Sequence, residues 1–151
     1  MTEKDNLREI YAEINRRNPF VRYNHIEVEA VERDRAVLSL TIRPESLNLY
    51  GQLHGGAIYT MADNAAGCAT RTDGRLYVTQ SSDMHYLHNQ SEGTVRAEAR
   101  VRHRGRTTVL VEVSVTGDEG KLLASGTFTF FCVDKPSETC ESGGEELKNK
   151  S

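Results

Sequence analysis

The sequence has few cysteines, no excess of positive charge and no long apolar run. Its 151 residues carry a formal net charge of −3, so the overall charge does not favour binding to nucleic acid or to an anionic membrane. No apolar run approaches the roughly 18 residues that would span a bilayer. The N-terminal residues lack the apolar segment of a secretory signal. These absences predict a cytoplasmic protein without a nucleic-acid or membrane partner.

Only three cysteines are present, Cys68, Cys132 and Cys140, at wide spacing. An odd number of widely spaced cysteines favours reduced thiols over a disulfide framework. No cysteine or histidine spacing resembles a metal site, and we expect neither a metal nor another cofactor. The length suits a single domain with one hydrophobic core.

The most informative stretch of the chain lies between residues 48 and 72. Turn-forming residues precede it, and from residue 57 the side chains are mostly small or apolar, without the alternation of a strand. Six apolar residues recur at helical spacing: Ile58, Met61, Ala62, Ala65, Ala66 and Ala69. Because the opposite side also carries little charge, we expect a helix over residues 55–72 that is buried nearly all round. Residues 72–74, with the sequence Thr-Asp-Gly, are expected to end it.

Two features distinguish this helix from a purely structural one. Gly55 and Gly56 open it, and their missing side chains leave backbone N–H groups accessible at the positive end of the helix dipole. Such a position favours an anion or a developing oxyanion. Asp63 places a carboxylate in the middle of the apolar helix. A buried lone charge is costly, so Asp63 has either a structural partner or a functional role. The combination favours a functional site.

This stretch resembles the signature of a known family. The residues that carry the resemblance are Asn48, Gly51, His54, Gly55, Gly56 and Asp63. Their spacing is similar to that in the hotdog-fold acyl-CoA thioesterases, and closest to the phenylacetate-degradation (PaaI-like) group. The resemblance covers about residues 20–133. It implies a homodimer that forms the active site, assembled further into a homotetramer.

The rest of the chain agrees with that fold. Residues 2–18 read as an amphipathic helix with Leu7, Ile10, Tyr11 and Ile14 on one stripe, ended by Pro19. Alternating apolar residues predict strands over 26–30, 36–42, 76–87, 95–102, 109–115 and 122–133. The order predicts an α+β hotdog fold, an antiparallel sheet of about six strands wrapped around one long central helix. We expect an N-terminal helix over 1–19, the hotdog domain over 20–133 and a disordered polar tail over 134–151.

The resemblance assigns catalytic roles around the predicted helix. The Gly55 amide would hold the thioester carbonyl as an oxyanion donor, a contact worth about 3 kcal/mol of barrier. Asn48 would assist at the same carbonyl or fix the loop. His54 would donate a hydrogen bond to the substrate or the leaving sulfur, or else only brace the helix start. Asp63 would serve as general base or as nucleophile, and no Ser-His-Asp or Cys-His signature competes with it.

A hydroxyl on the strand after the helix should orient Asp63 or the attacking water. Aligning residues 86–89 and Gly93 with the family places this hydroxyl at Thr79, whereas aligning by Asp83 places it at Ser81. We prefer Thr79. Because side chains alternate along a strand, residues 79 and 81 are expected to face the same side.

The remaining expected contacts are with CoA. The turn containing His103, Gly105 and Arg106 resembles the family's His-x-Gly-Arg segment beside the pantetheine arm and nucleotide. Gly56 and Ser81 complete the expected substrate-binding set. The competing interpretation is that the alternating arginines of residues 96–106 form a solvated strand face.

Together these residues predict an acyl-CoA thioesterase that hydrolyses an aryl-acetyl- or medium-chain acyl-CoA to the free acid and CoA. The alternative is a non-catalytic acyl-CoA-binding or sensing module on the same fold. A hotdog hydratase would carry an Asp-x-Asn-x-x-His motif, which the sequence lacks. Eight helical residues separate Gly55 from Asp63, about 12 Å along the axis, so we expect two subunits to share each site.

Overall fold

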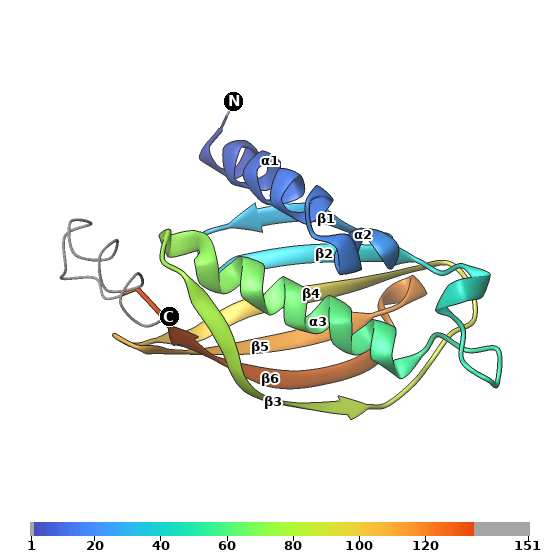
Figure 1. The fold of residues 1–151 in the computed structure, drawn as a ribbon. Coiled ribbons are helices and arrows are strands. Elements are labelled where there is room, and N and C mark those ends of the chain that lie inside the picture. Colours follow the sequence, from blue (N-terminus) through green and yellow to red (C-terminus); the bar gives the residue numbers. More distant parts are fainter. Residues whose placement is uncertain (1, 135–151) are drawn as a thin grey trace, which may run out of the picture.

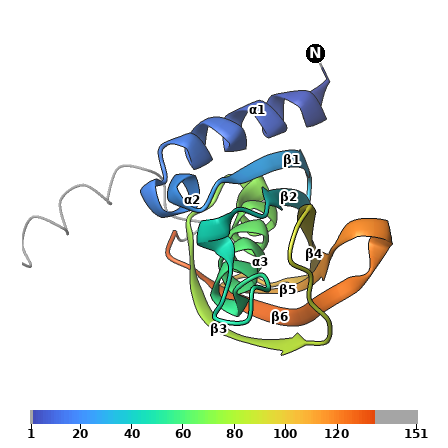
Figure 2. The same cartoon turned by 90° about the vertical axis from the view of Figure 1, so that its right-hand side faces the viewer.

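The computed structural model describes residues 2–134 and shows one curved antiparallel sheet with a helix across its concave face (Figure 1). The strand order is β1-β2-β4-β5-β6-β3. The strands are β1 (Ile26–Glu32), β2 (Arg35–Thr41), β3 (Tyr77–Tyr86), β4 (Thr94–Arg104), β5 (Thr108–Thr116) and β6 (Leu122–Cys132). The helices are α1 (Glu3–Arg16), α2 (Pro19–Tyr23) and α3 (Gly55–Thr70). Seen end-on in Figure 2, the sheet wraps around α3, as the hotdog fold requires.

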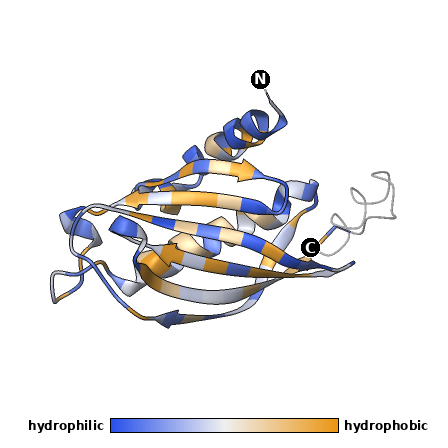
Figure 3. Ribbon diagram, turned by 180° about the vertical axis from the view of Figure 1, so that it is seen from behind, coloured by the Kyte–Doolittle hydropathy of each residue, from blue (hydrophilic) through white to orange (hydrophobic). Residues whose placement is uncertain are grey.

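The strands form where apolar and polar residues alternate, and Figure 3 shows this alternation along the sheet. In β5 the four odd-numbered valines from Val109 to Val115 are buried, while the residues between them are exposed. The buried side packs on Ile58, Met61 and the alanines of α3, all within the core. Burying each large aliphatic side chain contributes about 1.5–3 kcal/mol, and the small alanines allow the helix to approach the sheet closely.

The helix α3 is buried all round over residues 65–70 but on one side only over residues 55–64, so the prediction of burial nearly all round is wrong for the first part of the helix. Tyr59, Thr60, Asp63 and Asn64 are half-buried on the side away from the core. The reason is geometric, because one sheet can cover only one face of a helix. This outward face of α3 is the part of the helix available to a substrate or a second subunit.

The N-terminal segment also differs from its prediction. Pro19 does not simply end one helix, because α1 stops at Arg16 and Pro19 opens α2. Proline suits the first position of a helix since it has no N–H to leave unpaired, and the Asn18 side chain caps the turn. Of the predicted stripe, Tyr11 is buried, whereas Ile10 and Ile14 stay exposed because α1 packs mainly over the edge strand β1.

The predicted tail over 134–151 lies outside the described residues except for residue 134. Between residues 2 and 134, no helix is both long and apolar enough to cross a membrane.

Candidate active site

The start of α3 is built around His54, which is its N-cap. The Nδ1 atom of His54 accepts a hydrogen bond from the Gly56 N–H at 2.8 Å, and the His54 carbonyl accepts from the N–H groups of Ala57 and Ile58. The neutral imidazole therefore carries its proton on Nε2, which can donate to a ligand. His54 thus has the bracing role that was one of its two predicted roles. The expectation that the Gly56 amide is open to a ligand is wrong, because His54 occupies it.

The Gly55 N–H is the open donor of this helix start. Within residues 2–134 it has no hydrogen-bond acceptor, as expected for an N–H in the first turn of a helix. The Gly55 carbonyl accepts a hydrogen bond from the Tyr86 hydroxyl at 3.0 Å. A Cβ at residue 55 would lie 3.4 Å from the Tyr86 ring, so this ring packs closely over the glycine.

The loop before α3 is ordered by Asn48. Its Oδ1 atom accepts hydrogen bonds from the N–H groups of Tyr50 and Gln52 at 2.8 and 3.1 Å, an Asx-turn that closes the loop around Gly51. Asn48 therefore fixes the loop, one of its two expected roles. Its Nδ2 group has no acceptor among the described residues and remains a donor for a ligand.

The carboxylate of Asp63 lies on the half-buried face of α3. Its Oδ1 atom accepts a hydrogen bond from the Thr79 hydroxyl at 2.8 Å. Within residues 2–134 no lysine, arginine or histidine forms an ion pair with Asp63. One carboxylate oxygen is thus held by β3, while the other is left for a water molecule or a substrate. Asp63 and Gly55 of one chain are not hydrogen-bonded to each other.

Ser81 lies on the other face of β3, which overturns the expectation that residues 79 and 81 face the same side. Thr79 pairs with Phe130 of β6 and Ser81 with Thr129, so Gln80 is an extra residue and forms a β-bulge. The extra residue reverses the alternation. Thr79 turns toward α3, and Ser81 turns outward, where its hydroxyl hydrogen-bonds that of Thr129 at 2.6 Å.

A further polar contact between α3 and β3 was not predicted. The Tyr59 hydroxyl hydrogen-bonds that of Ser82, and the Tyr59 ring packs edge-to-face on Phe128. Tyr59 lies one helical turn after Gly55 and one before Asp63. Three polar contacts therefore connect β3 to one stripe of α3: Tyr86 with Gly55, Ser82 with Tyr59, and Thr79 with Asp63. We call them the α3–β3 ladder.

The turn containing His103, Gly105 and Arg106 lies at the opposite end of α3 from Gly55. The neighbouring Arg104 donates hydrogen bonds to the carbonyls of Thr70 and Ala69 at the helix C-terminus. Gly55 and Thr70 are about 22 Å apart along the axis at 1.5 Å per residue. One chain therefore does not bring this turn to Gly55, while Asp63 lies about midway along the helix. Gly105 is needed for the turn itself, because a Cβ there would lie 2.9 Å from the Thr108 carbonyl oxygen.

Most of the arginines near this turn are paired. Arg96 pairs with Glu29, Arg100 with Glu98, Arg102 with Glu112, and Arg104 with Asp34 and Asp73. The interpretation of a paired, solvated face thus accounts for the first three. Arg106 is exposed and has no ion pair among the described residues, so it is the cation of this turn that is available to a phosphate.

Arg104 belongs to a buried network that sequence reasoning missed. Burial alone would raise the pKa of Asp73, but hydrogen bonds from Tyr77 and Arg75, with Arg104 nearby, lower it to about 2. Burial and the Asp73 carboxylate raise the pKa of Tyr77 to about 12. The network closes the C-terminal end of α3. Its only sequence signal is that an acidic, a basic and an aromatic residue stand at every second position, 73, 75 and 77.

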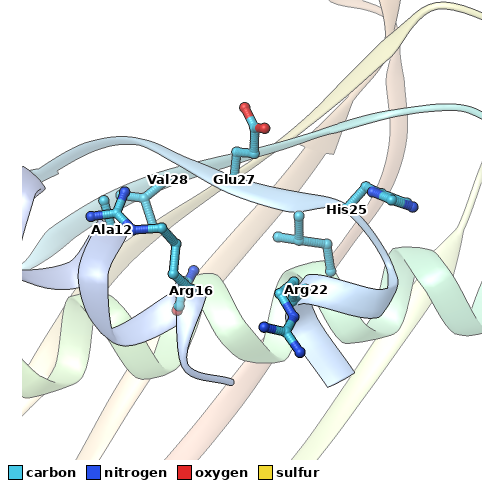
Figure 4. Close-up of a pocket in the computed structure, with 8 residues that line it drawn as sticks. Ala12, Arg16, Arg22, His25, Glu27 and Val28 are labelled. Carbon is cyan, nitrogen blue, oxygen red and sulfur yellow. The ribbon is translucent and has the colours of Figure 1, made fainter. Parts of the chain in front are cut away.

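A separate cavity of about 340 Å³ lies between α1, α2 and the start of β1 (Figure 4). The charged groups of Arg16, Arg22 and Glu27 point in different directions around it. They do not converge on one ligand position, and Arg16 already pairs with Glu13. Within residues 2–134, no group of three or more His, Cys, Asp or Glu side chains could hold a metal ion.

Comparison with known proteins places this fold and site in a family. The model of the thioesterase superfamily matches residues 50–124. The acyl-coenzyme A thioesterase PaaI of Escherichia coli K12 is 27% identical over 100 residues, covering 66% of this chain and 71% of that protein. The 1,4-dihydroxy-2-naphthoyl-CoA hydrolase of Listeria monocytogenes is 30% identical over 101 residues, covering 65% and 82%. A Streptococcus mutans protein whose crystal structure contains acetyl CoA is 33% identical with a TM-score of 0.70, covering 73% and 90%.

The chain belongs to the thioesterase superfamily, as a PaaI-like member with the hotdog fold. The predictions of the family, of the fold and of a hydrolase that acts on thioester bonds are thereby confirmed.

Proposed function

We propose that this protein is an acyl-CoA thioesterase in which Asp63 activates a water molecule for attack on the thioester carbonyl. The observation that carries the proposal is the Asp63 carboxylate itself. One of its oxygens is oriented by Thr79 and the other has no partner among residues 2–134, on the half-buried outward face of a helix whose first N–H is open. Hydrolysis of an acyl group requires a positioned base and an oxyanion donor, and α3 carries both.

In this mechanism the Gly55 N–H and the Asn48 Nδ2 group hold the carbonyl oxygen, on which negative charge develops. The oxygen gains charge only as the tetrahedral intermediate forms, so these donors stabilise the transition state more than the substrate. Thr79 keeps the carboxylate in place, and His54 Nε2 is placed to donate to the leaving sulfur. Direct attack by Asp63, which would form an anhydride, uses the same residues.

We infer that two subunits complete each site. Gly55 and Asp63 are about 12 Å apart along one helix, too far for both to contact one carbonyl group. The strand β3 is an edge strand of the sheet. It is ten residues long and most of its residues are exposed, including the apolar Val78, which is about half exposed. Such an unprotected edge is suited to pair with a second copy, which would bring its own α3 alongside. A homodimer joined there, and paired again as a homotetramer, fits these features.

The substrate we propose is an aryl-acetyl- or medium-chain acyl-CoA. Support comes from the relatives, since one is a PaaI thioesterase and another is named for an aromatic acyl-CoA. The exposed Arg106 at the 104–107 turn would contact a CoA phosphate, and in a dimer this turn could come from the partner of the chain that supplies Asp63. We propose the cytoplasm as the location, in keeping with the free thiols of Cys68 and Cys132.

The test is the Asp63→Asn variant, assayed by release of free thiol from a panel of acyl-CoAs. Asparagine can still accept the Thr79 hydrogen bond through its carbonyl oxygen, so the shape is kept and only the base is lost. We expect kcat to fall by about 10² or more, with acyl-CoA affinity little changed. Asp83→Asn, on the outward face of β3, is the matched control and should keep full kcat.

Three outcomes would each contradict a different part of the proposal: the enzymatic activity, the role of Asp63 or the shared site. If the wild-type protein binds acyl-CoA but releases no thiol, the protein is a binding module instead of an enzyme. If Asp63→Asn stays within about threefold of the wild type, Asp63 is not the base. A fully active monomer, measured by light scattering at assay concentration, would refute the shared site.

A further inference from the structure

Tyr86 contacts the first turn of α3 from the far end of β3. Its hydroxyl donates a hydrogen bond to the Gly55 carbonyl, and its ring packs over the place where a side chain would stand at residue 55. Among residues 2–134, Tyr86 is the only residue of the sheet that hydrogen-bonds to residues 54–56. Burial raises the pKa of Tyr86, so the phenol keeps its proton and donates at neutral pH.

Two other segments hold the chain just before this turn, since the His54 N–H donates to the Ser46 carbonyl at 2.8 Å and the Leu53 N–H to the Gln90 carbonyl at 2.9 Å. Within the turn the remaining hydrogen bonds are local. The Gly56 N–H is held by His54, and the His54 carbonyl is held by Ala57 and Ile58. These contacts give the turn its shape, but they do not orient it relative to the sheet. The Gly55 N–H shares a rigid peptide plane with the His54 carbonyl, so these contacts set its direction within the turn. Its position relative to β3 depends on contacts from outside the helix, and the Tyr86 hydroxyl supplies the one that comes from the sheet.

We propose that Tyr86 is a positioning residue that aims the Gly55 N–H at the thioester carbonyl. This inference rests on the proposed thioesterase function. In the α3–β3 ladder, β3 holds the base through Thr79 near one end and the oxyanion donor through Tyr86 at the other. One strand thus orients the two groups that α3 contributes to catalysis. Catalysis is sensitive to such placement, since a displacement of about 1 Å can cost 10²-fold in rate.

The Tyr86→Phe variant separates the hydroxyl from the ring. Phenylalanine keeps the packing against Gly55 but leaves its carbonyl without the outside donor. Removing an oxyanion donor outright costs about 10²–10³ in kcat, and loosening one should cost less. We expect kcat to fall by about 5- to 20-fold, with KM within about twofold of the wild type, because the donor acts mainly in the transition state.

Tyr77→Phe is the matched control. It removes a phenol hydroxyl that contacts Asp73 just beyond the other end of α3. We expect it to lower the melting temperature while kcat stays within about twofold. A merely structural role for Tyr86 would make the two variants alike, with a lower melting temperature and little change in kcat.

An NMR measurement tests the placement without relying on activity. In ¹⁵N spectra the Gly55 amide should shift in Tyr86→Phe, whereas the Gly105 amide, at the far end of the molecule, should not change. If the wild type hydrolyses acyl-CoA and Tyr86→Phe keeps full kcat or an unshifted Gly55 amide, the role of Tyr86 is refuted while the thioesterase proposal stands. If the wild type releases no thiol, both are refuted.

Discussion

The clearest quantitative prediction concerns the stability that Asp73 gives to the C-terminal end of α3. Its side chain is 8% exposed and accepts hydrogen bonds from the Tyr77 hydroxyl at 2.5 Å, the Arg75 N–H at 2.9 Å and the Arg104 guanidinium at 2.9 Å. Burial opposes the charge, but these partners lower the pKa to about 2 from an ordinary value of 3.8. The difference corresponds to about 2 kcal/mol of folding free energy.

The sign of the pH dependence follows from that lowered pKa. Because the folded protein binds the Asp73 proton less tightly than the unfolded chain, the contribution is fully present above about pH 4. It is lost as the pH falls through 3.8 toward 2. Asp73→Asn should therefore lower the free energy of unfolding by about 2 kcal/mol at pH 7. It should also flatten the decline of stability between pH 5 and pH 2.

Urea unfolding followed by circular dichroism at several pH values measures both effects. Asp83→Asn, an exposed carboxylate on β3, serves as the control and should change the free energy of unfolding by no more than about 0.5 kcal/mol. The reasoning would be refuted if Asp73→Asn were as stable as the wild type at pH 7. It would be refuted equally if the variant lost stability with falling pH as steeply as the wild type.

Two further predictions concern β3. Thr79→Ala should lower kcat about 10-fold in the thiol-release assay, because Asp63 loses the donor that orients it. Ser81→Ala, on the outward face of β3, should have little effect. The reverse result would show that the β-bulge is misplaced. Gly126→Ala should lower the free energy of unfolding in urea by about 1–3 kcal/mol, because a Cβ there would lie 2.1 Å from the Asp83 carbonyl oxygen. Unchanged stability would mean that β3 and β6 pair less closely than the structure shows.

Much of the fold could be predicted from local pattern alone. The alternation in residues 109–115 shows which side chains face the core, because a regular strand repeats every two residues. In residues 26–32 a bulge after Val28 interrupts the pattern and buries Val31 in place of Ala30. The apolar run after Gly56 likewise predicts α3, since helical spacing is a local property. The motif from Asn48 to Asp63 could also be recognised, as its residues lie within one loop and one helix.

The position of each group in the site depended on contacts between distant residues. Alternation placed Thr79 and Ser81 on one face, and only the pairing of β3 with β6 introduces the bulge at Gln80 that separates them. The same holds for Tyr86, whose hydroxyl meets Gly55 across 31 residues of chain. A bulge or a long-range hydrogen bond depends on which strand lies beside which, and no periodicity in a single segment encodes that.

By itself, the sequence determined the strands, the central helix and the chemical groups at its start, because each follows from spacing within a short segment. The tertiary structure alone decided which of those groups remain free. His54 accepts the hydrogen bond of the Gly56 N–H, while the Gly55 N–H stays open. Thr79 donates to one oxygen of Asp63, and Arg104 donates to Asp73. A hydrogen-bonding group is used up or left available according to what folding brings within about 3 Å of it, and that is a property of the whole chain.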